Sequence, residues 1–260
     1  MKIIVNYANP RYRQAQKFNT ESALEVGKVD CVLEYGPESI DIDFFEKNRT
    51  VLQHEKGGGY WLWKPYIILD ALRKSKLGDI LMYVDSGCHF IKEMDHLTGL
   101  IETSGQDIIP FEVQHQESAW SKRDAFILMG VDGLGYETSR QRLSGFIMIK
   151  NSQFSQNFFE EFLSFSQDIR IVGDYPNVCG FDNFPGFQSN RHDQTVFSLL
   201  SKKYKLEAYR DPSQWGNPEI RRYPNSPYPQ LIDLTRKTNP KKPRYLKRKL
   251  KEFKNFLGSL

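Results

Sequence analysis

Apolar residues along this chain follow two different spacings. Five short runs are rich in β-branched and aromatic residues, as buried strands are, and they lie at 3–8, 29–35, 80–85, 107–112 and 145–150. Four longer stretches repeat apolar residues every three or four positions, as helices do, and they lie at 63–74, 118–129, 154–165 and 193–204. Strands that alternate with helices in this way predict an α/β fold with a mixed, mostly parallel central sheet flanked by helices.

Two stretches without such spacing connect these elements. Residues 176–190 are rich in glycine, proline, asparagine and phenylalanine, which predicts either an ordered loop beside a site or merely a long connection. Residues 211–229 contain five prolines and few helix signals, so we expect them to wrap around the surface. The composition changes near Lys237, and we therefore divide the chain into a single domain at 1–236 and a tail at 237–260.

Composition limits the classes of protein to consider. With 260 residues, 39% of them apolar and 26% charged, the chain can bury its own core, which argues against disordered and fibrous proteins. The three cysteines lack the spacing of a zinc site or a disulfide framework. No stretch reaches the about 18 apolar residues of a membrane span, and the first residues turn polar too soon for a signal peptide. We therefore expect a cytoplasmic protein.

The positive charge of the chain is concentrated in its tail. The whole chain has a net charge of +4, but residues 241–254 carry eight basic residues and one acidic residue. The rest of the chain is therefore mildly acidic, and it gives no support for nucleic-acid binding. Apolar tail residues recur at helical steps, at Leu246, Leu250, Phe253, Leu257 and Leu260. Such a basic amphipathic helix either lies on the anionic surface at the inner face of the membrane, or it docks on the domain with its basic side chains in water.

One carboxylate stands directly after a predicted buried strand. The apolar run at 80–84 is followed by Asp85, Ser86 and Gly87. Ligands of open α/β sheets bind just beyond the carboxyl ends of the strands, so Asp85 is well placed for a site. Its oxygens suit a divalent cation held against a diphosphate, and Gly87 would let the backbone approach a ligand closely. The alternative is an aspartate that only caps a turn.

Three further clusters carry charge. Residues 57–59 are glycines that precede two tryptophans and Lys64, but the Walker pattern GxxxxGK[ST] is absent. This segment is either a flexible lid with Lys64 aimed at phosphate or a surface loop whose tryptophans anchor a helix. Arg123 lies on a helical turn with another cation and an acid, where a solvated face is the simplest interpretation. Four hydrogen-bonding side chains stand at the predicted start of an apolar helix, Arg191-His192-Asp193-Gln194. One N-cap would suffice there, so the cluster suggests a site.

The first strand, the motif Tyr83–Gly87 and the motif His192–Gln194 together resemble nucleotide-sugar-dependent glycosyltransferases of the GT-A type. More narrowly, the pattern GYWLWKPYII…GDILMYVDSGC resembles bacterial and viral members associated with polysaccharide synthesis. The resemblance covers residues 1–210. It implies a single Rossmann-like GT-A domain that binds a nucleoside diphosphate sugar at the strand ends, usually with Mn²⁺ or Mg²⁺.

The resemblance also implies roles for residues in donor binding. Asn6 and Tyr7 would lie near the base and ribose, and Lys64 and Arg123 would neutralise phosphate. Asp85 would take the first position of the D-x-D metal and ribose motif. Gly87 stands at the second position, so a metal ion would rest on one carboxylate, or transfer would proceed without a metal.

For catalysis, the resemblance points to the second motif. Asp193-Gln194 matches an Asp-Gln pair that stands beside the anomeric carbon in several retaining families, and His192 adjoins it. Other families place a base-acting aspartate at a comparable position, so inversion stays open. In an inverting reaction a carboxylate must remove the proton of the acceptor.

The resemblance therefore predicts a hexosyl- or pentosyltransferase, with retention favoured over inversion. It would move a sugar from a nucleotide-sugar donor to a glycan or lipid-linked acceptor in cell-surface polysaccharide synthesis. The glycine at position 87 supports an alternative, a non-catalytic nucleotide- or carbohydrate-binding module of the same fold. Turnover of a nucleotide sugar separates the two hypotheses.

Overall fold

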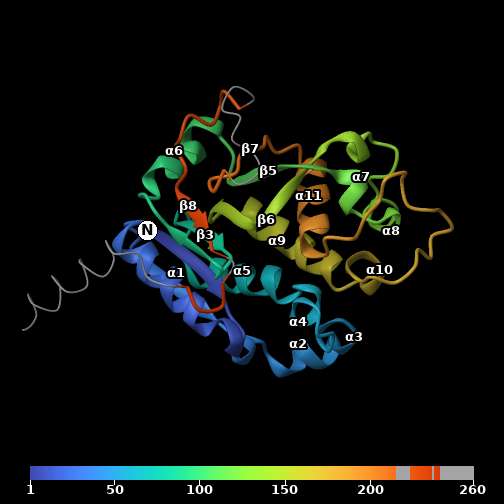
Figure 1. Ribbon diagram of the computed structural model, residues 1–260, viewed down its shortest axis with the longest axis horizontal. Helices are drawn as coiled ribbons and strands as arrows, with labels where there is room; N and C mark the ends of the chain where they lie inside the picture. The colour runs from blue at the N-terminus through green and yellow to red at the C-terminus, as the bar shows by residue number, and fades with distance from the viewer. Residues whose placement is uncertain (215–222, 236, 241–260) are drawn as a thin grey trace, which may run out of the picture.

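The computed structural model describes residues 1–214, 223–235 and 237–240. Within these ranges, six strands form one sheet in the order β2-β1-β3-β6-β5-β7, and β4 pairs with β8 in a separate ribbon (Figure 1). Neighbouring strands of the sheet are parallel, except that β6 runs against both β3 and β5. The predicted mixed, mostly parallel sheet is therefore confirmed. The strands are β1 Lys2–Tyr7, β2 Cys31–Tyr35, β3 Ile80–Val84, β4 Cys88–Phe90, β5 Ile108–Gln116, β6 Arg140–Lys150, β7 Tyr209–Arg210 and β8 Ile232–Leu234.

Helices cover both faces of this sheet (Figure 1). One core lies between the sheet and helices α5, α8, α9, α10 and α11, and the other lies between the sheet, α6 and the β4–β8 ribbon. Alternate residues of one strand serve the two cores, since Ile3 and Val5 belong to the first and Ile4 to the second. Burial on both faces explains why the strands are continuous apolar runs. The helices are α1 Arg13–Glu25, α2 Ile42–Lys47, α3 Arg49–Leu52, α4 Gly57–Tyr60, α5 Trp63–Lys74, α6 Asp95–Ser104, α7 Glu117–Trp120, α8 Arg123–Leu128, α9 Gln153–Ser166, α10 Ile169–Val172 and α11 Asp193–Lys203.

The order of the strands creates a switch point between β1 and β3. From β1 the chain passes through α1 to β2 on one side, and it later returns to β3 on the other side. Ligands of open α/β sheets bind at such a point, beyond the carboxyl ends of the strands. The antiparallel β6 brings its own residues to the same edge, because Phe146 pairs with Val84 and the Gly145 carbonyl accepts from Asp85 N at 3.0 Å.

Apolar spacing does not predict α1, because much of the buried face of this helix is polar. Gln16, Asn19 and Ser22 are all buried in it. Gln16 Nε2 donates to the Tyr35 carbonyl at 2.8 Å, and Asn19 Nδ2 donates to the Cys88 carbonyl at 3.0 Å. The helix therefore binds neighbouring elements through amides as well as through apolar contacts.

The prediction of one helix at 118–129 is wrong. Two short helices, α7 and α8, occupy this stretch, and Ser121 and Lys122 between them have extended backbone. Ser121 Oγ donates to the buried Glu117 Oε1 at 2.5 Å, and Lys122 Nζ donates to the Tyr175 carbonyl at 2.8 Å. Both contacts need distant or buried partners, so apolar spacing alone could not reveal the break.

The segments outside the regular elements include residues 176–190, the proline-rich segment 211–229 and the predicted tail. Residues 176–190 contain no helix or strand, and Asp124 holds them by accepting from Val178 N at 2.8 Å and Cys179 N at 3.1 Å. The segment expected to wrap around the surface instead buries Tyr228 in the second core. Of the predicted tail, residues 241–260 lie outside the described residues. No helix in the described ranges has both the length and the apolar character that crossing a membrane requires.

Candidate functional site

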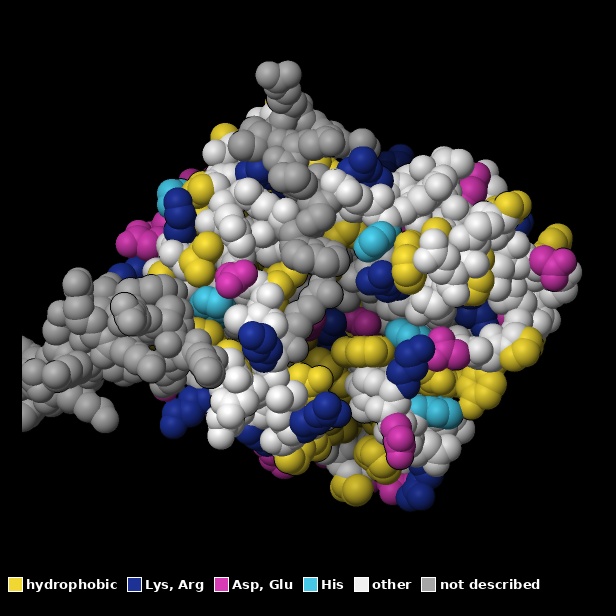
Figure 2. All heavy atoms as spheres, in the orientation of Figure 1, with side chains coloured by type: hydrophobic (Ala, Val, Ile, Leu, Met, Phe, Trp, Pro, Cys, Tyr) yellow, Lys and Arg dark blue, Asp and Glu magenta, His cyan; other side chains and the backbone are white. Residues whose placement is uncertain are grey.

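A cleft of about 900 Å³ opens at the switch point. Charged and histidine side chains gather around a hollow near the middle of the face shown in Figure 2. The volume of the cleft lies in the usual range of small-molecule sites. Of the nine residues that the resemblance links to donor binding or catalysis, seven line it, namely Tyr7, Lys64, Asp85, Gly87, His192, Asp193 and Gln194.

Asp85 presents an oriented but accessible carboxylate to this cleft. Its side chain is 46% exposed, and its Oδ1 accepts from the Tyr83 hydroxyl at 2.7 Å. Burial, reinforced by the charge of Asp85, raises the pKa of Tyr83 well above its usual value, so the phenol remains a donor. A Cβ at position 145 would stand 3.0 Å from Asp85 Oδ2, so glycine leaves room for the carboxylate there.

A buried lysine links Asp85 to the second motif. Lys64 Nζ lies 2.6 Å from Asp193 Oδ2 and 3.6 Å from Asp85 Oδ1, and the side chains of Lys64 and Asp193 are both buried. Burial alone would lower the pKa of Lys64, but Asp193 and then Asp85 outweigh it, so this pKa is raised. The ammonium is therefore held between carboxylates in the wall of the cleft, not projected from a flexible lid. One ammonium against two carboxylates leaves this trio with a net charge of −1.

The glycine-rich segment forms a folded wall beside this trio. Gly57, Gly58 and Gly59 have φ angles of 62°, 60° and 93°, which favour glycine. The Trp63 indole donates to the Gly57 carbonyl at 2.9 Å and stacks on Tyr7 with ring centroids 3.8 Å apart. Tyr7 thus lines the cleft within an aromatic pair.

His192 adopts a strained backbone conformation at the entrance to α11. Its φ of 53° and ψ of −116° are rare for a residue with a side chain, and such strain is typical of functional sites. Its Nδ1 donates to the Val172 carbonyl at 2.7 Å, and its ring stacks on Trp61 at 5.3 Å. Burial lowers the pKa of His192, which favours a neutral imidazole near pH 7.

Asp193 and Gln194 are held by residues of β6. Ser144 Oγ donates to Asp193 Oδ2 at 2.7 Å, and Ser144 N donates to Gln194 Oε1 at 3.4 Å. Gln194 Nε2 donates in turn to Gln141 Oε1 at 2.7 Å. Sequence reasoning missed Ser144 and Gly145, although a glycine inside an apolar strand often marks a close approach of other groups.

Two predicted donor-binding residues do not reach the cleft. Asn6 is fully buried, and its side chain is hydrogen-bonded to Asn19 at 2.8 Å and Gln16 at 3.0 Å. Successive residues of a strand point to opposite faces, so Tyr7 faces the cleft and Asn6 faces α1. Arg123 donates to Asp132 at 2.9 Å, and its guanidinium lies 4.0 Å from the ring centroid of Phe184, away from the cleft lining. Both assignments are therefore corrected.

The residues of the cleft offer limited ligands to a metal ion. In the described part of the chain, no three histidine, cysteine, aspartate or glutamate side chains are grouped closely enough to hold an ion. Asp85 supplies one accessible hard oxygen, whereas Asp193 is paired with Lys64. Such a set fits a cation that takes its other ligands from phosphate and water, as Mg²⁺ commonly does.

No family model and no curated protein sequence matches this chain. Solved structures are similar to it in fold. Mouse xyloside xylosyltransferase 1, in its apo form, matches with a TM-score of 0.51 and 10% identity over 93% of this chain and 100% of that chain. A glycosyltransferase involved in glycosylation of the major capsid of PBCV-1 matches with a TM-score of 0.45 and 13% identity over 90% and 92% of the two chains. The likeness to the mouse structure confirms the expected fold, that of GT-A-type glycosyltransferases.

Proposed function

We propose that this chain is a glycosyltransferase that moves a hexosyl or pentosyl group from a nucleoside diphosphate sugar to a glycan or lipid-linked acceptor. One observation carries the proposal. At the switch point of a GT-A fold, the accessible Asp85 carboxylate and the buried Lys64–Asp193 pair share one cleft. This is where such a fold binds its ligand, and carboxylates placed there can stabilise the positive charge that develops on the transferred sugar.

The donor would lie with its diphosphate end beside Asp85 and its sugar beside Asp193. Transfer develops positive charge at the anomeric carbon, which carboxylate and amide oxygens stabilise. Asp193 and Gln194 would supply these oxygens, and the strained His192 backbone would set the start of α11 that carries them. Tyr7 and Trp63 would pack beside the nucleoside portion.

The proposed stereochemical course is retention. A base that takes the acceptor proton must be able to bind that proton. Lys64 Nζ at 2.6 Å and the Ser144 hydroxyl at 2.7 Å both contact Asp193 Oδ2, so this oxygen is already occupied by two donors. This pairing supports a charge-stabilising role for Asp193.

A divalent cation, Mn²⁺ or Mg²⁺, would be held by Asp85 and by the phosphates of the donor. When bound, it would supply positive charge to the departing diphosphate. Lys64, Asp85 and Asp193 together carry a net charge of −1, so a diphosphate beside Asp85 would be repelled by these three groups unless a cation lay between them. This repulsion supports the proposed cation. Arg11, Lys56 and Arg191 also line the cleft and would add further positive charge.

The setting we propose is synthesis of cell-surface polysaccharide, with the basic tail at the inner face of the membrane. The support is the sequence pattern of the tail, eight basic residues and an apolar stripe. Binding of the full chain to anionic vesicles, compared with a chain ending at Lys237, tests this part separately. Equal binding by the two chains would refute the proposal that the tail binds the membrane.

The main test is release of a nucleoside diphosphate from a panel of nucleotide sugars, with and without Mn²⁺. We expect one donor to be turned over, Asp85→Asn to lose at least about 100-fold in turnover, and EDTA to reduce it. The matched control is Asp95→Asn, whose side chain is 57% exposed and lies outside the cleft lining. Donor binding without any turnover would instead identify a binding module, and full activity of Asp85→Asn would refute the assignment of the site.

A further inference from the structure

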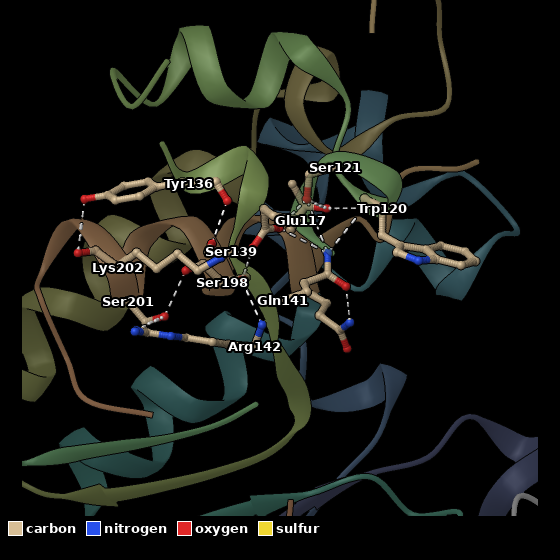
Figure 3. A network of polar contacts seen from close by, with 12 residues as sticks. Glu117, Trp120, Ser121, Tyr136, Ser139, Gln141, Arg142, Ser198, Ser201 and Lys202 are labelled. Atoms are coloured by element: carbon tan, nitrogen blue, oxygen red, sulfur yellow. Dashed lines mark hydrogen bonds and ion pairs between the residues drawn. The ribbon is translucent and has the colours of Figure 1, made fainter. Parts of the chain in front are cut away.

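Figure 3 shows a network of polar contacts that includes Glu117, Gln141 and Lys202. At its centre is Glu117, which is completely buried. Glu117 Oε1 accepts from Ser121 Oγ at 2.5 Å and from Gln141 Nε2 at 3.3 Å. Glu117 Oε2 accepts from the Ser198 hydroxyl and the Lys202 ammonium. The network thus joins α7 and α11 to β6 through a charged residue that the sequence reasoning did not single out.

The chemistry of this network determines the orientation of the Gln141 amide. Its Nε2 lies 3.3 Å from Glu117 Oε1 and 3.3 Å from the Trp120 carbonyl, and both of these oxygens only accept hydrogen bonds. The reverse orientation would place the amide oxygen against two acceptors. Gln141 Oε1 therefore points away from Glu117.

The orientation of Gln141 determines that of Gln194 in turn. Gln141 Oε1 can only accept, and Gln194 Nε2 donates to it at 2.7 Å. At the other end of the same side chain, Gln194 Oε1 accepts from Ser144 N. Both neighbours require the same orientation, which places the amide oxygen on the side of Ser144. The Ser144 hydroxyl donates to Asp193, so one residue of β6 contacts both the carboxylate of Asp193 and the amide oxygen of Gln194, and both of these residues line the cleft.

We infer that Glu117 is a positioning residue that acts through Gln141 to keep the amide oxygen of Gln194 on the side of the reacting sugar. The inference rests on the proposed glycosyl transfer. Positive charge developing at the anomeric carbon is stabilised by an amide oxygen and opposed by an NH₂ group. Together with Ser144 N, the buried carboxylate therefore fixes, through two amides, which end of the Gln194 side chain faces the anomeric carbon.

The variant Glu117→Gln tests this arrangement. The Lys202 ammonium requires an acceptor, so the new amide turns its oxygen to Lys202 and its NH₂ to Gln141, which disfavours the native orientation of Gln141. We expect kcat to fall about 10- to 100-fold, with the KM for the donor changed by less than about twofold. In the double variant Glu117→Gln/Gln141→Glu, the carboxylate at 141 accepts from both amides and restores the orientation of Gln194. One of its oxygens then faces the Trp120 carbonyl, but the Ser121 hydroxyl is close enough to donate to it. Part of the lost kcat should therefore return.

Two further variants separate positioning from stability. Ser201→Ala removes a buried hydroxyl of α11 that contacts Arg142 and the Ser198 carbonyl. This hydroxyl lies outside the path from Glu117 through Gln141 to Gln194, so the variant should keep the wild-type kcat. Gln141→Leu interrupts the path but leaves the Glu117–Lys202 pair in place, so it provides the measurement if Glu117→Gln does not fold. It should lose kcat as Glu117→Gln does.

The outcomes distinguish this inference from the proposed function. If the wild type turns over no nucleotide sugar, the proposed function fails and this inference fails with it. If the wild type is active and folded Glu117→Gln or Gln141→Leu keeps its kcat, only the positioning role is overturned. A folded double variant no more active than Glu117→Gln has the same meaning, since a merely structural role would show itself in the melting temperature alone.

Discussion

Replacing Lys64 by methionine would leave the Asp193 carboxylate buried without its counter-ion. Methionine keeps much of the length of the lysine side chain, so the change removes mainly the charge. The Asp193 side chain is only 6% exposed, and Lys64 Nζ lies 2.6 Å from it. Removing one partner of such a pair costs about 3–5 kcal/mol, because the remaining charge stays out of water.

Two features of the site place the expected cost near the lower end of that range. Ser144 continues to donate to Asp193, and Asp85 is 46% exposed, so water already solvates it. We therefore expect Lys64→Met to lose about 3 kcal/mol of the free energy of unfolding at pH 7. For a chain of this size, that corresponds to a fall in Tm of about 6–12 °C.

Thermal and urea unfolding followed by circular dichroism measure this loss. Lys74→Met is the control, because Lys74 makes a surface pair with Asp70 and is 61% exposed, and it should cost less than about 1 kcal/mol. The double variant Lys64→Met/Asp193→Asn removes both charges and should regain at least half of the loss. The reasoning is refuted if Lys64→Met melts no lower than Lys74→Met, or if the double variant is no more stable than Lys64→Met.

Three other perturbations test separate parts of the structure. Gly145→Ala would place a methyl group 3.0 Å from Asp85 Oδ2, so kcat/KM for the donor should fall at least about tenfold. Gly99→Ala is the control, because open space surrounds that position, and it should keep full activity. Asp124→Ala would release the amides of Val178 and Cys179; we expect a loss of about 2–3 kcal/mol and faster amide hydrogen exchange at both residues, and unchanged exchange there would contradict this role. Burial lowers the pKa of His89, so the unfolded chain binds more protons than the folded one below pH 6.5, and stability should fall as pH drops from about 7 to 5. His89→Phe should flatten this dependence of Tm on pH, and an equal slope in both proteins would rule out the contribution of His89.

The local spacing of apolar residues was sufficient to predict the main strands of the sheet and several of the helices. The strands bury both faces, so each is a continuous apolar run that can be recognised without knowing its neighbours. Helix α5 begins and ends as its spacing predicts, and α9 and α11 do so within one residue. Asp85 was identifiable because a site beyond a strand end follows from strand direction, which is a property of α/β sheets in general.

Polar partnerships could not be predicted in the same way, because they depend on which distant residues come together. The pairing of Lys64 with Asp193 joins positions more than a hundred residues apart, and α1 was missed because amides as well as apolar side chains fill its buried face. A shift of one position along β1 separates Tyr7 in the cleft from Asn6 outside it. Apolar periodicity predicts burial, because each side chain is apolar or polar by itself. A hydrogen bond or an ion pair needs two residues, and the sequence does not say which two come together. The chain alone therefore indicated which strand end opens into the cleft, and the folded arrangement determined which charges meet there and how they are oriented.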